Sequence, residues 1–261
     1  MAMYDPVLVR MPAEQRTPLT PFVSPWSPNR IVSLEDDFRV VPATTLALRD
    51  AAYRVRFKVY CDELGWERAS DFPDGRETDV FEASAQHCLV THAASSAVAG
   101  CVRVLSPAPA TANRLPFESV SQTDLSGTAF DPDVIGRGRI AEVSRFTLIA
   151  AYRRSQRTAC DPDTVSWRTA PATLLALAGL AMVIKRNAAI AFAMMEPRLA
   201  RQLRMVGICF EQVGALVEHR GARALFALDV ASAWNLLSPE CRIDLARILA
   251  ALPSDSSAAA C

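Results

Sequence analysis

The stretch that decides the fold is Ile140-Ala-Glu-Val-Ser-Arg-Phe-Thr-Leu-Ile149, an apolar segment that contains a small group of polar side chains. A short apolar run of this kind predicts a β-strand. Side chains alternate between the two faces of a strand, so we expect Glu142 and Ser144 on one face and Arg145 on the other. Glu142 is therefore a candidate base, and Arg145 is a candidate for an ion pair that holds the site in place. An ordinary edge strand with solvated charges is the alternative, since an isolated Glu-x-x-Arg is a weak motif.

Helices and strands are expected on both sides of this segment. Apolar spacing predicts helices over 44–66, 170–187, 197–205 and 237–252. Strands are predicted over 38–41, 87–91, 98–105, 189–195, 210–217 and 224–230. This order predicts an α/β fold with a mixed central sheet and helices on its faces.

Three regions of the chain differ in composition. Six prolines and little periodicity predict a flexible leader over residues 1–35. Residues 36–235 are expected to form one domain, and residues 236–261 a C-terminal helix and tail. Within the domain, residues 106–138 form a long, poorly periodic connection, and a connection of that length often covers a functional site.

Composition limits the partners and the compartment. The 28 basic residues match the 28 acidic ones, so no global field attracts nucleic acid. The seven cysteines are scattered without Cys-x-x-Cys, and only three histidines accompany them, which argues against a metal site and for a reducing compartment. The most apolar run, 173–184, is shorter than the roughly 20 residues that span a bilayer. We therefore expect a cytoplasmic protein without a transmembrane segment.

Several segments together resemble one enzyme family in their order and spacing. They are Arg56-Phe-Lys-Val-Tyr60 with Trp66, Glu77-Thr-Asp79-Val-Phe81-Glu82, Gly100-Cys-Val-Arg103, Leu115-Pro-Phe117-Glu118, Glu142-Val-Ser-Arg145 and the run from Glu196 to Phe210. They resemble the GNAT superfamily of N-acetyltransferases, in its branch of acyl-homoserine-lactone synthases and long-chain N-acyl amino acid synthases. Acyltransferases associated with exosortase systems are also similar. The resemblance covers roughly residues 38–230 and implies a three-layer fold with a splayed central sheet.

The sequence departs from the family pattern at three places. Tyr60 stands where lactone synthases usually have Phe, and Glu82 stands where an Asp is typical. The connection over 151–162 has no glycine, whereas the wider family holds the pyrophosphate of coenzyme A on a Gly-rich turn. The cations in this connection are expected to contact a phosphopantetheine arm or an acidic carrier protein, unless they are simply solvated. These cations are Arg153, Arg154 and Arg157.

The resemblance implies an acyltransferase that moves a medium or long fatty acyl group to the α-amino group of an amino acid or a small related amine. The expected donor is the thioester of an acyl carrier protein, or else acyl-coenzyme A, with no covalently bound cofactor. Two alternatives stay open. One is an acyl-homoserine-lactone synthase that uses S-adenosylmethionine, and the other is a non-catalytic module that binds acyl chains or carrier proteins.

The catalytic residues implied are on the central strand. Glu142 is the expected base, provided that burial raises its pKa, and a structural ion pair is the alternative. The backbone N–H groups near Phe146 and Thr147 are expected to stabilise the oxyanion where the strand bulges, with Ser144 beside them.

A second group is expected to bind the acceptor. Arginines and carboxylates would form a network that closes the acidic loop over it, although a surface network without function is the alternative. Trp66 and Phe117 would line the acyl pocket unless they are plain core. His87 is expected to be a core histidine. The network residues are Arg56, Asp79, Glu82, Arg103 and Arg145.

Overall fold

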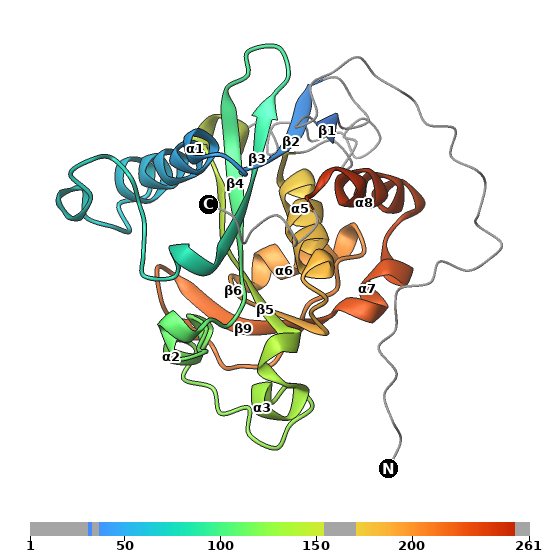
Figure 1. Cartoon of the computed structure of the whole chain (residues 1–261). Helices are drawn as coiled ribbons and strands as arrows, with labels where there is room; N and C mark the ends of the chain where they lie inside the picture. The colour runs from blue at the N-terminus through green and yellow to red at the C-terminus, as the bar shows by residue number, and fades with distance from the viewer. Residues whose placement is uncertain (1–30, 33–36, 154–170, 254–261) are drawn as a thin grey trace.

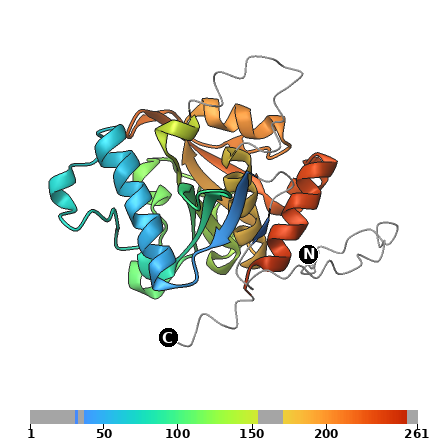
Figure 2. The ribbon, with the colours of Figure 1, turned by 90° about the horizontal axis from the view of Figure 1, so that it is seen from above.

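The computed structural model describes residues 31–32, 37–153 and 171–253. In this part of the chain, helices flank both faces of a mixed nine-stranded sheet (Figure 1). Viewed from above, α1 lies on one side of the sheet, with α5 and α8 on the other (Figure 2). The α/β class and the mixed sheet flanked by helices are therefore confirmed.

The strands follow the order β1-β2-β3-β4-β5-β6-β9-β7, with β8 paired to β9. Only β5 and β6 pair in parallel among these strands, and the other neighbours are antiparallel. Their bounds are β1 Ile31–Val32, β2 Phe38–Pro42, β3 Ala85–His92, β4 Val98–Leu105, β5 Ile140–Leu148, β6 Ile190–Met195, β7 Glu211–Gln212, β8 Val217–Glu218 and β9 Ala222–Asp229.

The parallel pair β5–β6 splits part-way along its length. Ladder pairing runs from Ile140 opposite Ile190 to Glu142 opposite Phe192 and then ends, although both strands continue. The predicted splayed sheet is thus confirmed. The divergence begins at Glu142, which places this carboxyl where the sheet opens.

Helices α1 and α5 cover opposite faces of the sheet. The first begins where the Thr45 hydroxyl accepts a hydrogen bond from the N–H of Leu48, a typical N-cap. The bounds of the α-helices are α1 Leu46–Phe57, α2 Phe117–Val120, α3 Pro132–Ile135, α5 Pro171–Lys185, α6 Pro197–Met205, α7 Val230–Leu236 and α8 Pro239–Ala251. Shorter turns are η2 Lys58–Glu63, η3 Ala69–Asp71, η4 Glu82–Ser84, η5 Pro109–Thr111 and η6 Arg137–Arg139.

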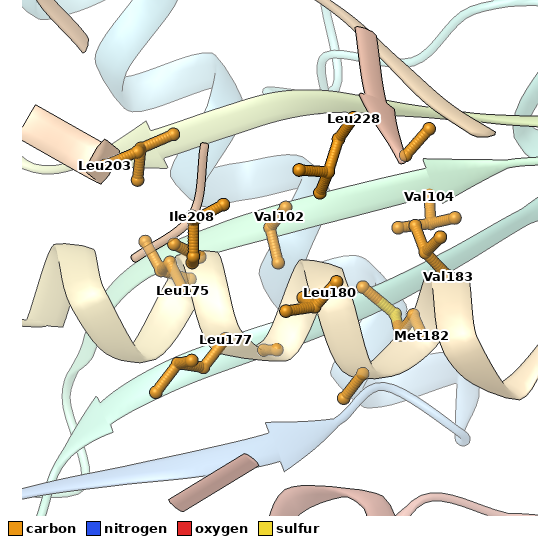
Figure 3. Packing of buried hydrophobic residues seen from close by; sticks show 14 of the residues in the cluster. Val102, Val104, Leu175, Leu177, Leu180, Met182, Val183, Leu203, Ile208 and Leu228 are labelled. Carbon is orange, nitrogen blue, oxygen red and sulfur yellow. The ribbon is translucent and has the colours of Figure 1, made fainter. Parts of the chain in front are cut away.

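The main core lies between α5 and the sheet. Leu175, Leu177 and Leu180 of α5 are buried with Val102 of β4 and Leu228 of β9 (Figure 3). Because α8 packs on α5 as well, α5 is buried on nearly every side, which explains why its sequence is apolar throughout. A smaller cluster joins α1 to the opposite face of the sheet through Ala52, Val55, Leu89 and Cys101.

Four elements differ from the prediction. The helix expected over 44–66 ends as an α-helix at Phe57 and widens into the π-helical turn η2. The strand expected over 210–217 is wrong for its middle part, since only the short strands β7 and β8 form there. Helix α7 was not predicted, because the signal for it is mainly the Asp229 cap on the N–H of Ala231. Strand β1 lies within the expected leader, and the remainder of that leader is outside the described residues.

Strand β5 is bulged beside the polar group. Arg103 pairs with Ser144 and Cys101 with Thr147, so two residues of β5 face one residue of β4. Arg145 has a φ of 52°, a left-handed conformation that is uncommon for a residue other than glycine. The predicted alternation of faces is therefore wrong at Arg145, because the bulge turns its side chain toward Asp79, which Arg103 also contacts.

Gly100 permits the close approach of β4 to β5 next to this bulge. A Cβ atom at this position would lie 2.2 Å from the carbonyl oxygen of Thr147, and backbone cannot yield as a flexible side chain does. We expect Gly100→Ala to lower the free energy of unfolding by about 1–3 kcal/mol, the usual effect of overpacking. Chemical denaturation measures this loss. Gly138→Ala is the matched control, because nothing lies within 4 Å of the added atom, and an equal loss in both variants would contradict the steric explanation.

Candidate active site

A cavity of about 1100 Å³ lies where β5 and β6 diverge. One part has apolar walls that come from α5, β6, α6 and the segment after α6. The other part is polar and is formed by β5, η2, the acidic loop and the hairpin β8–β9. The apolar walls include Leu180, Val183, Ala193, Val206, Ile208 and Phe210. The cavity therefore joins an apolar chamber to a charged one.

Glu142 lies in the wall of this cavity and is almost completely buried. The N–H of Phe117 in α2 donates to its Oε2 at 2.9 Å. The Phe117 ring stacks on Phe192, the residue opposite Glu142 in the sheet, with centroids 4.4 Å apart. Burial raises the pKa of Glu142 to about 7, although the Phe117 N–H and nearby arginines oppose this shift. A carboxyl with this pKa can both accept and release a proton near neutrality.

Arg103 is the centre of the predicted charge network. Its side chain is fully buried, and its Nη1 donates to Asp79 and to Glu82 at 2.8 Å each. Its Nε donates to the Ser144 hydroxyl at 3.1 Å. Ser144 is thus engaged with the network, and Arg103 links β4 to the acidic loop and to β5.

Glu77 is a member of the network that was missed in the sequence. This carboxylate is 1% exposed and accepts hydrogen bonds from Arg56 and from Arg145 Nη2, the latter at 2.9 Å. Arg56 is equally buried and contacts Glu82 at 2.9 Å, while Arg145 contacts Asp79 at 2.9 Å. The five predicted members are therefore brought together. The available signal for Glu77 was its position two residues before Asp79 on the same acidic loop.

His87 belongs to the same buried group rather than to the core alone. Its Nε2 lies 3.0 Å from Glu82 Oε2. Burial lowers the pKa of His87, so the ring is neutral at neutral pH. Burial alone would raise the pKa of Glu82, but the His87 hydrogen bond and the charges of Arg56 and Arg103 hold it well below its usual range. Glu82 therefore stays ionised and balances the arginines.

The network is expected to tolerate the loss of one member poorly. Glu77→Gln removes the charge that two buried arginines face, and breaking a buried ion pair in this way costs about 3–5 kcal/mol. Urea denaturation near neutral pH measures the change. Asp50→Asn is the matched control, because Asp50 pairs with the exposed Arg54 at 2.7 Å and water screens such pairs. Similar losses in both variants would show that burial does not set the cost.

Aromatic rings and cations form a row along the polar wall. Tyr60 in η2 stacks on Trp66, with centroids 5.8 Å apart. The guanidinium carbon of Arg145 lies 5.9 Å from the Tyr60 ring, and that of Arg223 lies 5.0 Å from the Trp66 ring. Both contacts have cation–π geometry. Trp66 lines the cavity in this polar wall, and its role in the acyl pocket stays a prediction. Arg223 was not singled out in the sequence.

The Tyr60 hydroxyl has a specific partner. It lies 2.9 Å from the Thr147 hydroxyl, which also lies 2.9 Å from the Arg145 carbonyl oxygen. A hydroxyl has one proton, so Thr147 donates to this carbonyl and accepts from Tyr60. The tyrosine at this position thereby ties η2 to the bulge of β5. The neighbouring Phe146 lines the cavity, and the role of its N–H as an oxyanion donor stays a prediction.

The predicted donor cations are only partly described. Arg153 lines the cavity and contacts Glu63 Oε2 at 2.7 Å, and it also donates to the Leu148 carbonyl. Arg154 and Arg157 lie outside the described residues, so the phosphate-binding cluster stays a prediction. Across the described ranges, no group of His, Cys, Asp and Glu side chains is arranged to hold a metal ion. No helix within them is long and apolar enough to cross a membrane.

Residues 55–160 match the family model described as "Acetyltransferase (GNAT) domain". This range contains Glu142 and the whole buried charge network. Within residues 55–160 the chain is therefore similar to a GNAT acetyltransferase domain. No curated protein matches the sequence.

Similarity to solved structures extends over more of the chain than residues 55–160. FeeM, an N-acyl amino acid synthase from uncultured soil microbes, has 18% identity and a TM-score of 0.53, covering 77% of this chain and 94% of its own. TofI in a ternary complex with an inhibitor and MTA has 18% identity and a TM-score of 0.50, covering 83% and 100%. The acyl-homoserine-lactone synthase LasI has 14% identity and a TM-score of 0.50, covering 81% and 95%. At these identities the likeness concerns the fold.

Proposed function

We propose that this GNAT-type protein transfers a fatty acyl group from a phosphopantetheine thioester to the α-amino group of an amino acid or a related amine. The observation that carries the proposal is the position of Glu142. A buried carboxyl with a pKa of about 7 lies where an apolar chamber meets a charged one. An acyl chain and a polar amine would meet at such a boundary.

The apolar chamber supports a fatty rather than an acetyl donor. Its walls run from Glu142 through β6 to α6 and include Val206, Ile208 and Phe210. Each methylene group buried in such a chamber contributes about 0.8 kcal/mol. An acetyl group would leave most of a cavity of about 1100 Å³ unfilled, so a medium or long chain uses the site better.

The proposed reaction balances without a cofactor. Glu142, directly or through water, takes the proton from the acceptor amine as its nitrogen attacks the thioester carbon. The N–H groups of Phe146 and Thr147 stabilise the negative charge that forms on the carbonyl oxygen. Collapse of this intermediate breaks the carbon–sulfur bond, and the thiolate leaves with the proton from Glu142. The products are an amide and a free phosphopantetheine thiol.

The donor is proposed to be an acyl carrier protein, with acyl-coenzyme A as the other candidate. The support is the absence of glycine from the sequence of residues 151–162, because the usual backbone cradle for pyrophosphate is a Gly-rich turn. Arg153 at the cavity wall is already paired with Glu63, so the contact with the donor would need the further arginines of this connection or a rearrangement of that pair.

One assay separates the proposal from its alternatives. Purified protein is incubated with dodecanoyl, myristoyl or palmitoyl thioesters of carrier protein or coenzyme A, together with proteinogenic amino acids, and products are identified by mass spectrometry. We expect an N-acyl amino acid as product. The apolar chamber suits the acyl chain, and the Glu142 carboxylate at its boundary can accept the proton of the amine.

The other outcomes have distinct meanings. Release of an acyl-homoserine lactone when S-adenosylmethionine is supplied would instead establish the lactone synthase. Donor binding without any acylated amine would favour the non-catalytic module.

The pH profile tests the role of Glu142. Only the ionised carboxylate accepts a proton, so kcat is expected to rise as pH passes upward through about 7, the pKa of this group. Glu142→Gln should lower kcat by about 100- to 10,000-fold and remove this ascending limb. Steady-state kinetics from acid to alkaline pH measures both effects.

The matched control is Glu211→Gln, since Glu211 is exposed on β7 and does not line the cavity. Its profile should equal that of the unaltered protein. Circular dichroism confirms that Glu142→Gln remains folded. Unchanged turnover in a folded Glu142→Gln protein would remove Glu142 from the mechanism.

A further inference from the structure

The hairpin β8–β9 places three basic side chains in the cavity wall, two from its tight turn and one from the start of β9. His219, Arg220 and Arg223 all line the cavity next to Trp66. Arg220 and Gly221 have φ angles of 53° and 94°, so the turn reverses within two left-handed residues. All three residues line the same cavity as Arg145 and Glu142.

The buried charge network does not have spare positive charge for an anionic ligand. Three arginines face three carboxylates in it, and every one of these six groups has an opposite charge within about 3 Å. A carboxylate that entered would add negative charge to a network whose charges are already balanced. The members are Arg56, Arg103 and Arg145 with Glu77, Asp79 and Glu82.

The hairpin cations are balanced differently. Arg220 pairs with Glu67. Arg223 is half-buried, its guanidinium carbon lies 5.0 Å from the centroid of the Trp66 ring, and its Nε donates to the Arg220 carbonyl oxygen at 3.4 Å. No carboxylate within the described ranges forms an ion pair with it. Burial lowers the pKa of His219, and the charges of Arg223 and Arg145 lower it further. Arg223 thus adds a positive charge, unpaired among the described carboxylates, to the wall that also contains His219.

We propose that Arg223, with His219 beside it, binds the α-carboxylate of the acceptor, so that the acceptor is an amino acid with a free carboxylate rather than a simple amine. This inference rests on the proposed function. The amine of the acceptor lies toward Glu142, and its carboxylate lies toward the hairpin. The guanidinium fork offers paired donors to a planar carboxylate, and its cation–π contact with Trp66 holds it at the cavity wall.

The test compares an amino acid with its carboxamide, which has a similar shape but lacks the carboxylate charge. The amino acid that is acylated best in the mass-spectrometry assay and its carboxamide are used with unaltered protein, Arg223→Gln and Arg223→Lys. We expect Arg223→Gln to raise the KM for the amino acid about 10- to 100-fold, the range for a lost charged hydrogen bond, with kcat and the KM for the acyl donor little changed. The amide should bind the unaltered protein and Arg223→Gln equally weakly. Arg223→Lys should keep part of the preference for the amino acid over its amide.

A binding measurement without turnover separates the two proposals. Isothermal titration calorimetry measures the affinities of the amino acid and of its amide without turnover. We expect tighter binding of the amino acid, and we expect Arg223→Gln to remove this preference. If this preference is found but no acyl transfer occurs, the carboxylate site stands and the proposed reaction fails. Turnover with equal use of acid and amide, or a KM unaffected by Arg223→Gln, overturns the carboxylate site and leaves the reaction intact. Arg49→Gln on the exposed side of α1 is the matched control and should change none of these values.

Discussion

The divergence of β5 from β6 after Glu142 is the constraint on which the rest of the structure depends. Parallel strands normally stay paired, and here the pairing stops inside the core. The opening needs walls, which the apolar residues of α5 and α6 supply. It also needs partners for the polar groups at its edge, and the N–H of Phe117 supplies one for Glu142. The cavity and its carboxyl thus arise from a single break in the sheet.

The buried ion pairs are best understood as positioning devices. Burying charges costs desolvation that their attraction barely offsets, so such pairs are weak evidence of stability. Their contacts, however, fix the acidic loop, β4 and β5 relative to one another through Arg103 and Glu77. The left-handed Arg145 completes this arrangement, because only the bulge lets its side chain reach both Glu77 and Asp79. A strained residue is tolerated here because several ion pairs determine its place.

Much of the fold was predictable because its signals are local. The apolar content of α5, the short apolar runs of β3 and β4, and the Pro197 start of α6 are read within a few residues. The five predicted residues of the charge network also lie together, and it was the resemblance of their spacing to a known family that singled them out. Glu77 and Arg223 were missed for a different reason. Their importance depends on contacts with residues distant in the sequence, Arg145 for the first and Trp66 for the second, and no local pattern encodes such contacts.

The balance of the network also sets the chemistry available to Glu142. Burial raises its pKa, while Arg103 and Arg145 pull the value down and Asp79 pushes it up. Had these arginines faced the cavity without their own carboxylates, their full positive charge would have held Glu142 ionised as a much weaker base. Pairing them inside the protein keeps the pKa close to neutrality. An uncompensated cation for the acceptor is then better placed on the separate hairpin, at Arg223, where it attracts a carboxylate and is not among the principal charges that act on Glu142.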